Sequence, residues 1–169
     1  LTNAVNLIDG LDGLATGVTL ISLVTMGIVG FFFLKSWQHY VPIMCIMLAA
    51  CLLGFLPYNF HPAKIFLGDT GALYIGFMIS VFSLKGLKNV TFVSLLVPIL
   101  ILGVPITDTV YAMIRRKLNK KNISQADKHH LHHQLMRMGL THRQTVLAIY
   151  GISLIFSFVS LLSLVSPRW

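Results

Sequence analysis

The sequence predicts an all-α, polytopic integral membrane protein with about five transmembrane helices, since each crossing needs about 20 apolar residues. Of its 169 residues, 56% are hydrophobic and only 11% are charged, and the mean hydropathy is +0.80. This composition excludes an ordinary soluble globular domain. A net charge of +8 in a soluble protein would suggest a nucleic acid partner, but here it indicates basic cytoplasmic loops. We therefore expect the lipid bilayer, and no nucleic acid, as a partner.

Five apolar stretches are each predicted to form a helix. They cover roughly residues 14–34, 41–59, 71–84, 90–114 and 145–166. The third is short for a crossing, and we expect it to gain length from residues 65–67 or 85–87 by tilting or snorkelling. Pro98 and Pro105 predict a kink in the fourth. The chain is thus expected to be one membrane domain over residues 1–169.

Alternate connections between such helices lie on the same side of the membrane. One side then holds residues 1–13, 58–70 and 115–145, and most of the 13 lysines and arginines fall there: Lys64, Arg115, Arg116, Lys117, Lys120, Lys121, Lys128, Arg137 and Arg143. The other side holds Lys35, Lys85, Lys88 and Arg168. Because positive residues concentrate in cytoplasmic loops, the first side is predicted to be cytoplasmic, with the N-terminus inside and the C-terminus outside.

Two amides and two carboxylates recur at three-residue intervals at the start of the chain, at Asn3, Asn6, Asp9 and Asp12. This spacing forms one polar stripe on a helix. The pairs Asp9-Gly10 and Asp12-Gly13 are turn signals, so we expect the helix to end or break there. Asp12 could simply cap the next helix, but capping does not account for all four side chains. The sequence contains no glutamate, so every acidic residue is an aspartate. Because a carboxylate near a membrane is costly, each of these aspartates needs a structural or functional reason.

A second motif, Phe66-Leu-Gly-Asp-Thr-Gly-Ala72, precedes the third apolar stretch. Asp69 could cap the helix that begins there. An oxygen ligand at this position could equally hold a divalent cation against a phosphate, near the favourable dipole of the helix N-terminus. Capping and ligation can coexist on different carboxylate oxygens, so both readings stay open.

A histidine-rich segment, Asp127-Lys-His-His-Leu-His-His133, is the third motif. A zinc site is one interpretation, although no Cys or Glu accompanies the histidines. A basic loop that meets anionic lipid headgroups is another. The third is a phosphate-binding cluster, supported by upstream cations: Arg115, Arg116, Lys117, Lys120 and Lys121. His61 and His142 stand apart, and the sequence assigns them no role.

Together these motifs resemble the polyprenyl-phosphate N-acetylhexosamine-1-phosphate transferase family. Residues 3–15 resemble its N-x-x-N-x-x-D-G-x-D-G-L-A motif, residues 66–71 its F-x-G-D-x-G motif, and residues 130–133 its H-x-H-H motif. The segments 58–66 and 141–146 are most similar to the branch that initiates wall teichoic acid synthesis.

The resemblance implies a bacterial plasma-membrane enzyme that transfers GlcNAc-1-phosphate from UDP-GlcNAc to undecaprenyl phosphate and releases UMP. It implies Mg²⁺, or Mn²⁺ in its place, with Asp69 as the metal ligand. It assigns Asp9, Asp12, Asp69 and His132 to catalysis. It assigns the following residues to substrate binding: Asn3, Asn6, His130, His133, Arg115 and Arg116.

The family also carries an adjacent aspartate pair that this chain lacks. The resemblance therefore implies the C-terminal half of a fold with roughly ten spans, each of about 20 residues. We expect the chain to be inactive alone, and a homodimer is compatible with the resemblance. The competing hypothesis is a transporter or channel with a cytoplasmic metal-binding histidine loop. Transporter sites lie near the bilayer midplane, whereas most acids here lie near one face.

Overall fold

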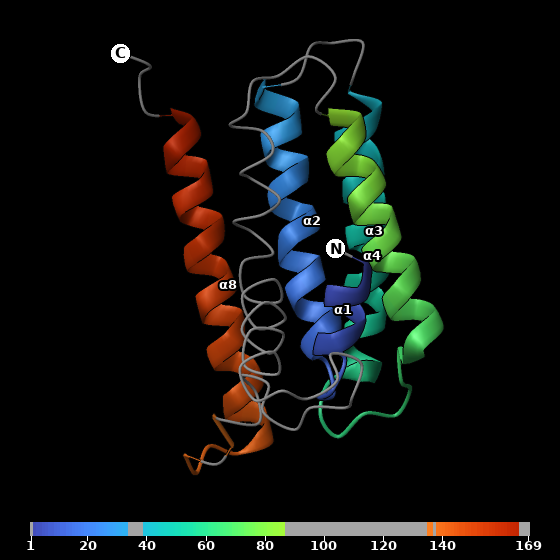
Figure 1. Cartoon of the computed structure of the whole chain (residues 1–169), viewed down its shortest axis with the longest axis vertical. Helices are drawn as coiled ribbons and strands as arrows, with labels where there is room; N and C mark the ends of the chain where they lie inside the picture. Colours follow the sequence, from blue (N-terminus) through green and yellow to red (C-terminus); the bar gives the residue numbers. More distant parts are fainter. Residues whose placement is uncertain (1, 34–38, 87–134, 137, 166–169) are drawn as a thin grey trace, which may run out of the picture.

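The computed structural model describes residues 2–33, 39–86, 135–136 and 138–165. Its named helices are α1 (Thr2–Ile8), α2 (Leu14–Phe33), α3 (Tyr40–Asn59), α4 (Gly68–Gly86) and α8 (His142–Val165) (Figure 1). The described residues contain no strand. The prediction of an all-α membrane fold is therefore confirmed.

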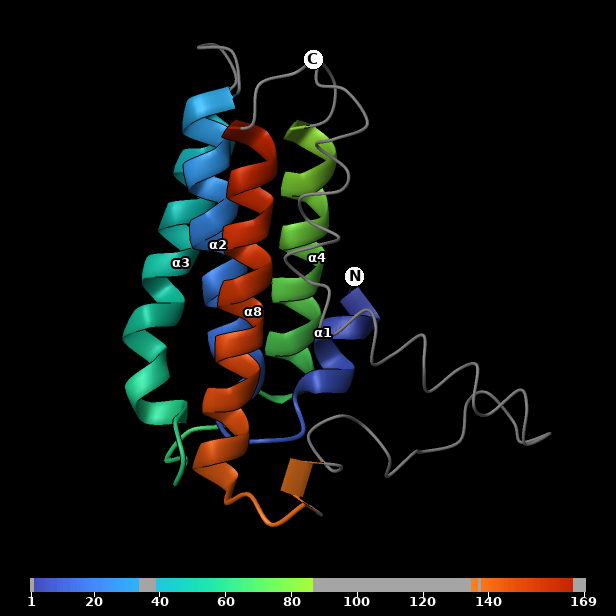
Figure 2. The same cartoon turned by 90° about the vertical axis from the view of Figure 1, so that its left-hand side faces the viewer.

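The long helices run alongside one another as a bundle. α2, α4 and α8 run in one direction and α3 runs in the opposite direction (Figures 1 and 2). Consequently the connection from α1 to α2, the connection from α3 to α4 and the start of α8 all lie at one end of the bundle. We call this the motif end, because Asp9, Asp12 and Asp69 belong to these segments.

Three of the described helices are long and apolar enough to cross a membrane, over Leu14–Phe32, Tyr40–Asn59 and His142–Leu162. α4 has 19 residues but is not among them. Its glycines, serines and terminal charges, Asp69 and Lys85, make it less apolar than the other three. It does extend beyond the predicted 71–84 at both ends, as expected for a stretch that needs length. The predicted span 90–114 lies outside the described residues.

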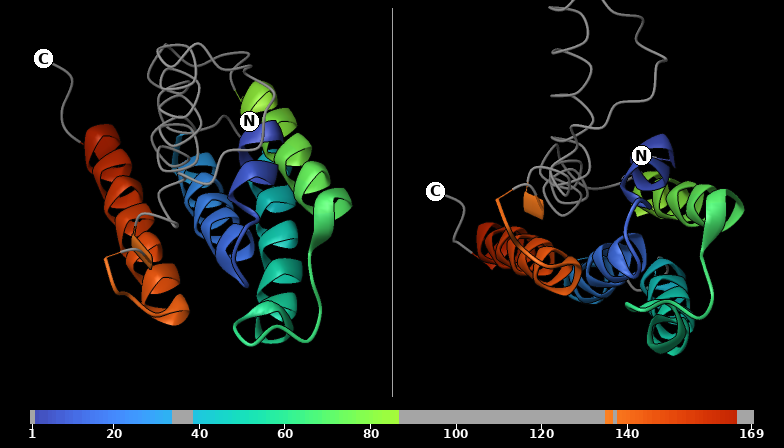
Figure 3. Two further views of the ribbon diagram at one scale, coloured as in Figure 1. Left: turned by 60° about the horizontal axis from the view of Figure 1, so that its bottom comes forward. Right: turned by 90° about the horizontal axis from the view of Figure 1, so that it is seen from below.

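Viewed along the bundle axis, α2 lies between α3 and α8, and α4 lies to one side of the α2–α3 pair, next to α1 (Figure 3, right). Two apolar clusters hold this arrangement, because burying apolar side chains is the main favourable contribution to packing. One joins α2, α3 and α4 through Leu23, Val41, Cys45, Ala49, Leu52, Ile75, Ile79 and Phe82. The other lies nearer the motif end and contains Ile8, Leu14, Ala15, Val18, Val146 and Ile149.

Glycines allow two of the helix contacts. A Cβ atom on Gly17 of α2 would overlap the ring of Tyr150 on α8. The Tyr150 hydroxyl donates a hydrogen bond to the carbonyl oxygen of Gly13, which fixes the start of α8 against the start of α2. A Cβ atom on Gly76 of α4 would lie 2.7 Å from the Cα atom of Thr2 on α1. Gly76 therefore lets α1 approach α4 closely.

The outward sides of α3 and α8 expose large apolar side chains, including Met47, Leu53, Ile155 and Phe158. Exposed apolar surface on this scale is unfavourable in water and suits contact with lipid. The fold thus places an apolar belt along the helices and the first two polar motifs at one end.

Candidate active site

The short helix α1 brings one motif residue against another from a distant part of the chain. The side-chain amide of Asn6 donates a 3.0 Å hydrogen bond to Oδ1 of Asp69, which lies 63 residues later in the first turn of α4. The close approach of α1 to Gly76 makes this contact possible. The first and second motifs therefore meet in the folded chain.

Asp9 follows α1 directly, at the turn that its Asp-Gly pair predicted. Partial burial and, to a smaller extent, the negative charge of Asp69 together raise the pKa of Asp9 to about 6. Two neighbouring carboxylates attract a cation, because a cation relieves their repulsion. Asn6, Asp9 and Asp69 form what we call the carboxylate group of the site.

Asp12 belongs to a different set of contacts. His61 Nδ1 donates a 2.9 Å hydrogen bond to Oδ2 of Asp12, and the backbone amide of Ala63 donates to the same oxygen at 3.2 Å. Burial acts to raise the pKa of Asp12. The hydrogen bonds from His61 and Ala63, with the neighbouring charge of His142, outweigh burial and lower this pKa below its ordinary value. Asp12 is therefore an anion at neutral pH.

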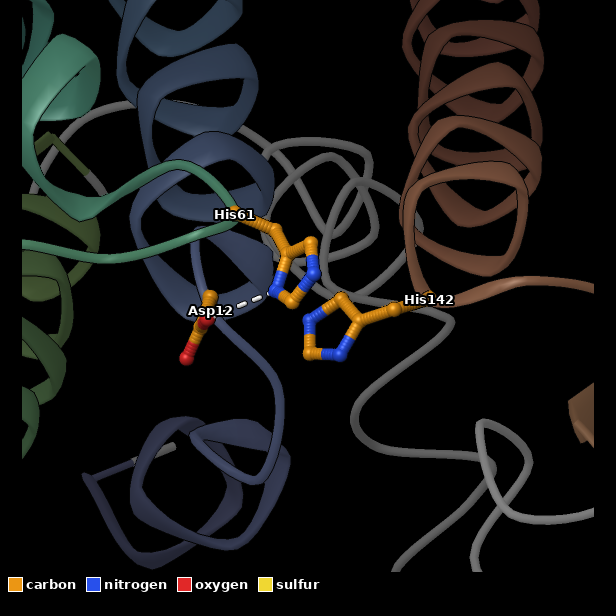
Figure 4. Close-up of side chains that lie close together, drawn as sticks. All are labelled: Asp12, His61 and His142. Carbon is orange, nitrogen blue, oxygen red and sulfur yellow. Dashed lines mark hydrogen bonds and ion pairs between the residues drawn. The ribbon is translucent and has the colours of Figure 1, made fainter.

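His142, the first residue of α8, stacks on the ring of His61 with the ring centroids 4.1 Å apart and the planes 19° from parallel. Figure 4 shows the two rings beside the carboxylate of Asp12. One potential ligand atom from each of Asp12, His61 and His142 lies within 4.8 Å of the others. We call these three residues the Asp-His-His group.

Asn59, which is only 3% exposed, anchors the loop that carries His61 through side-chain hydrogen bonds. The Thr16 hydroxyl donates a 2.7 Å hydrogen bond to Oδ1 of Asn59, and Nδ2 of Asn59 donates to the carbonyl oxygen of Ile65 at 3.0 Å. The Nε atom of Arg143 donates to the carbonyl oxygen of His61 at 3.1 Å. These bonds fix the loop on α2 and on α8.

The predicted site residues divide between these groups. Asn6, Asp9 and Asp69 come together, Asp12 pairs with the two histidines, and Asn3 is exposed on α1. The predicted residues His130, His132, His133, Arg115 and Arg116 lie outside the described residues. Sequence reasoning missed His61, His142 and Asn59, since no motif or spacing connects residues that only the fold brings together.

The fold and the site define an integral membrane protein with a polar site, built from carboxylates and histidines, at one end of its helix bundle. Residues 1–87 match glycosyl transferase family 4, which includes both motif regions of this site. The chain belongs to this family. The resemblance to the polyprenyl-phosphate hexosamine-1-phosphate transferases is thereby confirmed.

Three relatives illustrate the match. A probable undecaprenyl-phosphate N-acetylglucosaminyl 1-phosphate transferase of Bacillus subtilis is 51% identical over 100% of this chain and 47% of its own length. A decaprenyl-phosphate N-acetylglucosaminephosphotransferase of Mycobacterium tuberculosis is 37% identical, over 89% of this chain and 41% of its own length. A phospho-N-acetylmuramoyl-pentapeptide-transferase of Clostridium botulinum is 37% identical, over 96% of this chain and 48% of its own length. The chain spans about half the length of these relatives.

Proposed function

We propose that this chain supplies part of the active site of an enzyme that transfers GlcNAc-1-phosphate from UDP-GlcNAc to undecaprenyl phosphate. The products are undecaprenyl-pyrophosphoryl-GlcNAc and UMP, in the first membrane step of teichoic acid or another cell-wall polymer. The name of the Bacillus subtilis relative supports undecaprenyl phosphate as the acceptor and N-acetylglucosaminyl 1-phosphate as the transferred group. The observation that carries the proposal is the convergence of Asn6, Asp9 and Asp69 at the end of a membrane bundle.

The carboxylate group fits a magnesium ion, or manganese in its place. Both ions prefer oxygen ligands, and Asp9 and Asp69 offer two carboxylates; burial, with a smaller contribution from the charge of Asp69, raises the pKa of Asp9. Asp69 would hold the ion with Asp9 beside it, and the Asn6 amide would keep Asp69 oriented. When bound, such an ion neutralises charge on the transferring phosphoryl group.

The transfer itself needs positioning and cationic groups more than acid–base chemistry. A phosphate oxygen of the lipid attacks the β-phosphorus of UDP-GlcNAc. The bond from that phosphorus to the oxygen bridging to UMP breaks, and UMP leaves with the bond electrons. Asn3, Asn6, Asp9 and Asp12 would bind the nucleotide-sugar. The phosphates would be met by the basic third motif region: Arg115, Arg116, His130, His132 and His133.

The motif end is proposed to face the cytoplasm of a bacterial cell. The excess of lysine and arginine that the sequence shows in residues 1–13, 58–70 and 115–145 supports that orientation. A sugar nucleotide then reaches the site from the cytoplasm, and the lipid phosphate reaches it from the bilayer. The position of the carboxylate group at a bundle end speaks against the competing transporter hypothesis, because transporter sites lie near the midplane.

The proposal is tested in a fused protein that joins this chain to the part of the Bacillus subtilis relative that it does not match. Transfer is followed by UMP release and by labelled lipid product while magnesium is titrated. Asp69→Asn should slow transfer on the order of 100-fold and change its magnesium dependence, since it removes a charge that meets the ion. His132→Ala tests the third motif in the same assay.

Lys85→Gln provides the matched control, because Lys85 lies in the last turn of the same helix, at the opposite end of α4. It should leave the rate and the magnesium dependence unchanged. An Asp69→Asn variant with full rate and unchanged magnesium dependence contradicts the metal assignment. The 169-residue chain alone is expected to release no UMP.

A further inference from the structure

We infer that Asp12, His61 and His142 form a second metal site that takes a zinc-class transition metal and is distinct from the magnesium group at Asp69. The three side chains come from three segments: the turn before α2, the loop after α3 and the first residue of α8 (Figure 4). Their candidate ligand atoms lie within 4.8 Å of one another. The inference does not rest on the proposed transferase activity.

The donor set decides which metal fits. Two imidazole nitrogens and one carboxylate oxygen suit zinc and its neighbours in the first transition series, whereas magnesium prefers a shell of oxygens. Oδ2 of Asp12 already lies 2.9 Å from Nδ1 of His61. Three protein ligands leave one coordination position for water or an anion, which is the form of an open zinc site.

His142 supplies an independent observation. Its Nε2 atom is buried, and none of the described residues offers it a hydrogen-bond partner. Buried polar atoms in folded proteins nearly always have a partner, so an orphaned ring nitrogen beside a carboxylate and a second imidazole requires an explanation. A metal ion held by the three side chains would provide that partner once the stacked rings of His61 and His142 turn so that a nitrogen of each faces the ion.

Hydrogen bonds from neighbouring residues also hold the segments that carry the three proposed ligands. The Ala63 amide donates to Oδ2 of Asp12 at 3.2 Å, and the Nε atom of Arg143 holds the His61 carbonyl oxygen at 3.1 Å. The N-terminus of α8 is fixed by a reciprocal cap, in which Thr141 N donates to Oε1 of Gln144 at 2.9 Å and Gln144 N donates to Oγ1 of Thr141 at 3.4 Å. Such outer contacts orient ligands and raise metal affinity.

A bound ion would tie the start of α8 to both connections at the motif end. Asp12 and His61 are 49 residues apart in the chain, and α8 begins far later still. Because the metal binds only the folded arrangement, it should stabilise the fold by mass action. The site would thus also determine where the Asp9–Asp12 turn lies relative to α8.

The test is zinc binding by the purified 169-residue chain in detergent after treatment with a chelator. Zn²⁺ is titrated by calorimetry, and Co²⁺ is used as a spectroscopic probe, whose absorption reports nitrogen–oxygen coordination. The background variant carries Asn in place of His129, His130, His132 and His133, so that the histidine-rich motif cannot bind the probe. His61→Ala and His142→Ala are then compared in this background.

Each of these two variants should weaken zinc binding about 100-fold or more, since even outer contacts of a metal site are worth roughly 10-fold to 100-fold. His39→Ala is the matched control, because His39 precedes α3 at the other end of the bundle, where its ring lies in a tilted contact 5.9 Å from that of Phe31. It should leave zinc affinity unchanged. Excess Mg²⁺ should not displace zinc from the background protein.

Misfolding of a variant is separated from ligand loss by thermal unfolding. Zinc should raise the Tm of the background protein and of His39→Ala, but not that of His61→Gln or His142→Gln with unchanged helix content. Equal zinc affinity in the background protein and in the His61 and His142 variants overturns the inference. Displacement of zinc by equimolar magnesium overturns it as well.

Discussion

Thr16 of α2 and Asn59 of α3 meet inside the bundle through a 2.7 Å hydrogen bond between residues that are both almost fully buried. Asn59 also fixes the loop after α3, because its side-chain amide donates a 3.0 Å hydrogen bond to the Ile65 carbonyl oxygen. Between Asn59 and Ile65 lies His61, which contacts Asp12. An interior amide thus supports the loop that carries a candidate ligand.

Thr16→Val should therefore destabilise the protein by about 1–3 kcal/mol, because it leaves a buried acceptor on Asn59 without its donor. Thermal unfolding in detergent measures the effect. Thr25→Val is the control, since the Thr25 hydroxyl bonds only the carbonyl oxygen of Ile21 within the same helix among the bonds described. Equal destabilisation by the two variants would show that the Thr16–Asn59 hydrogen bond contributes no more to stability than the hydrogen bond of Thr25 within its own helix.

Gly76→Ala should push α1 away from α4 and separate Asn6 from Asp69. The new Cβ atom would lie 2.7 Å from the Thr2 Cα atom and 3.0 Å from its carbonyl oxygen, both of them backbone. Overpacking of this kind costs about 1–3 kcal/mol. We expect lower stability and a weaker response to magnesium in the fused protein.

Gly54→Ala in α3 is the control for that variant, because a Cβ atom at Gly54 meets nothing within 4 Å. Alanine in a helix interior should stabilise it by about 0.5–1 kcal/mol relative to glycine. Unchanged stability and magnesium response in Gly76→Ala would mean that α1 and α4 can repack without cost.

Asp9 gives a pH dependence with a defined sign. Its pKa is raised to about 6 in the folded protein by burial and by Asp69, so the folded state holds this proton more tightly than the unfolded state. Stability from this proton is present at low pH and is lost as the pH rises from the ordinary aspartate range to about 6.

Thermal unfolding without divalent ions should therefore show decreasing stability across that pH window, and Asp9→Asn should abolish this component. Magnesium binding should show the opposite trend, weakening below about pH 6 as Asp9 becomes protonated. A magnesium affinity that is independent of pH through this range, in the unsubstituted protein, would exclude Asp9 from the ion's surroundings.

Thr141→Ala removes one partner of the reciprocal cap at the start of α8. Loss of such a cap costs about 1 kcal/mol of helix stability. Thr141→Ser keeps the hydroxyl and should retain most of that stability, so the comparison isolates the hydrogen bond from the methyl group. Chemical unfolding in detergent gives both values, and identical values for Ala and Ser would rule out a stabilising cap.

Local signals in the sequence predicted the parts of this molecule that depend on neighbouring residues. The Asp9-Gly10 pair marked the end of α1, and hydropathy located α2, α3 and α8. The motif around Asp69 predicted that a helix begins there, and Asp69 lies in the first turn of α4. These features are encoded by residues close together in the chain.

The Asp-His-His group could not be found this way. His61 lies in a loop and His142 begins a helix, and 49 residues separate His61 from Asp12. Neither histidine has a neighbour at metal-ligand spacing in the sequence. Their stacking depends on how α8 docks on α2, which in turn depends on contacts such as that between Gly17 and Tyr150.

The turn between α1 and α2 carries Asp9 toward Asp69 and, three residues later, Asp12 toward His61. One short backbone segment therefore belongs to both groups. A ligand that repositions this turn while binding to one group changes the affinity of the other, and thermodynamic linkage requires the effect to be equal in both directions. Ligand occupancy at Asp9 and at Asp12 would then be cooperative, coupled through the short connection of residues 9–13 between α1 and α2.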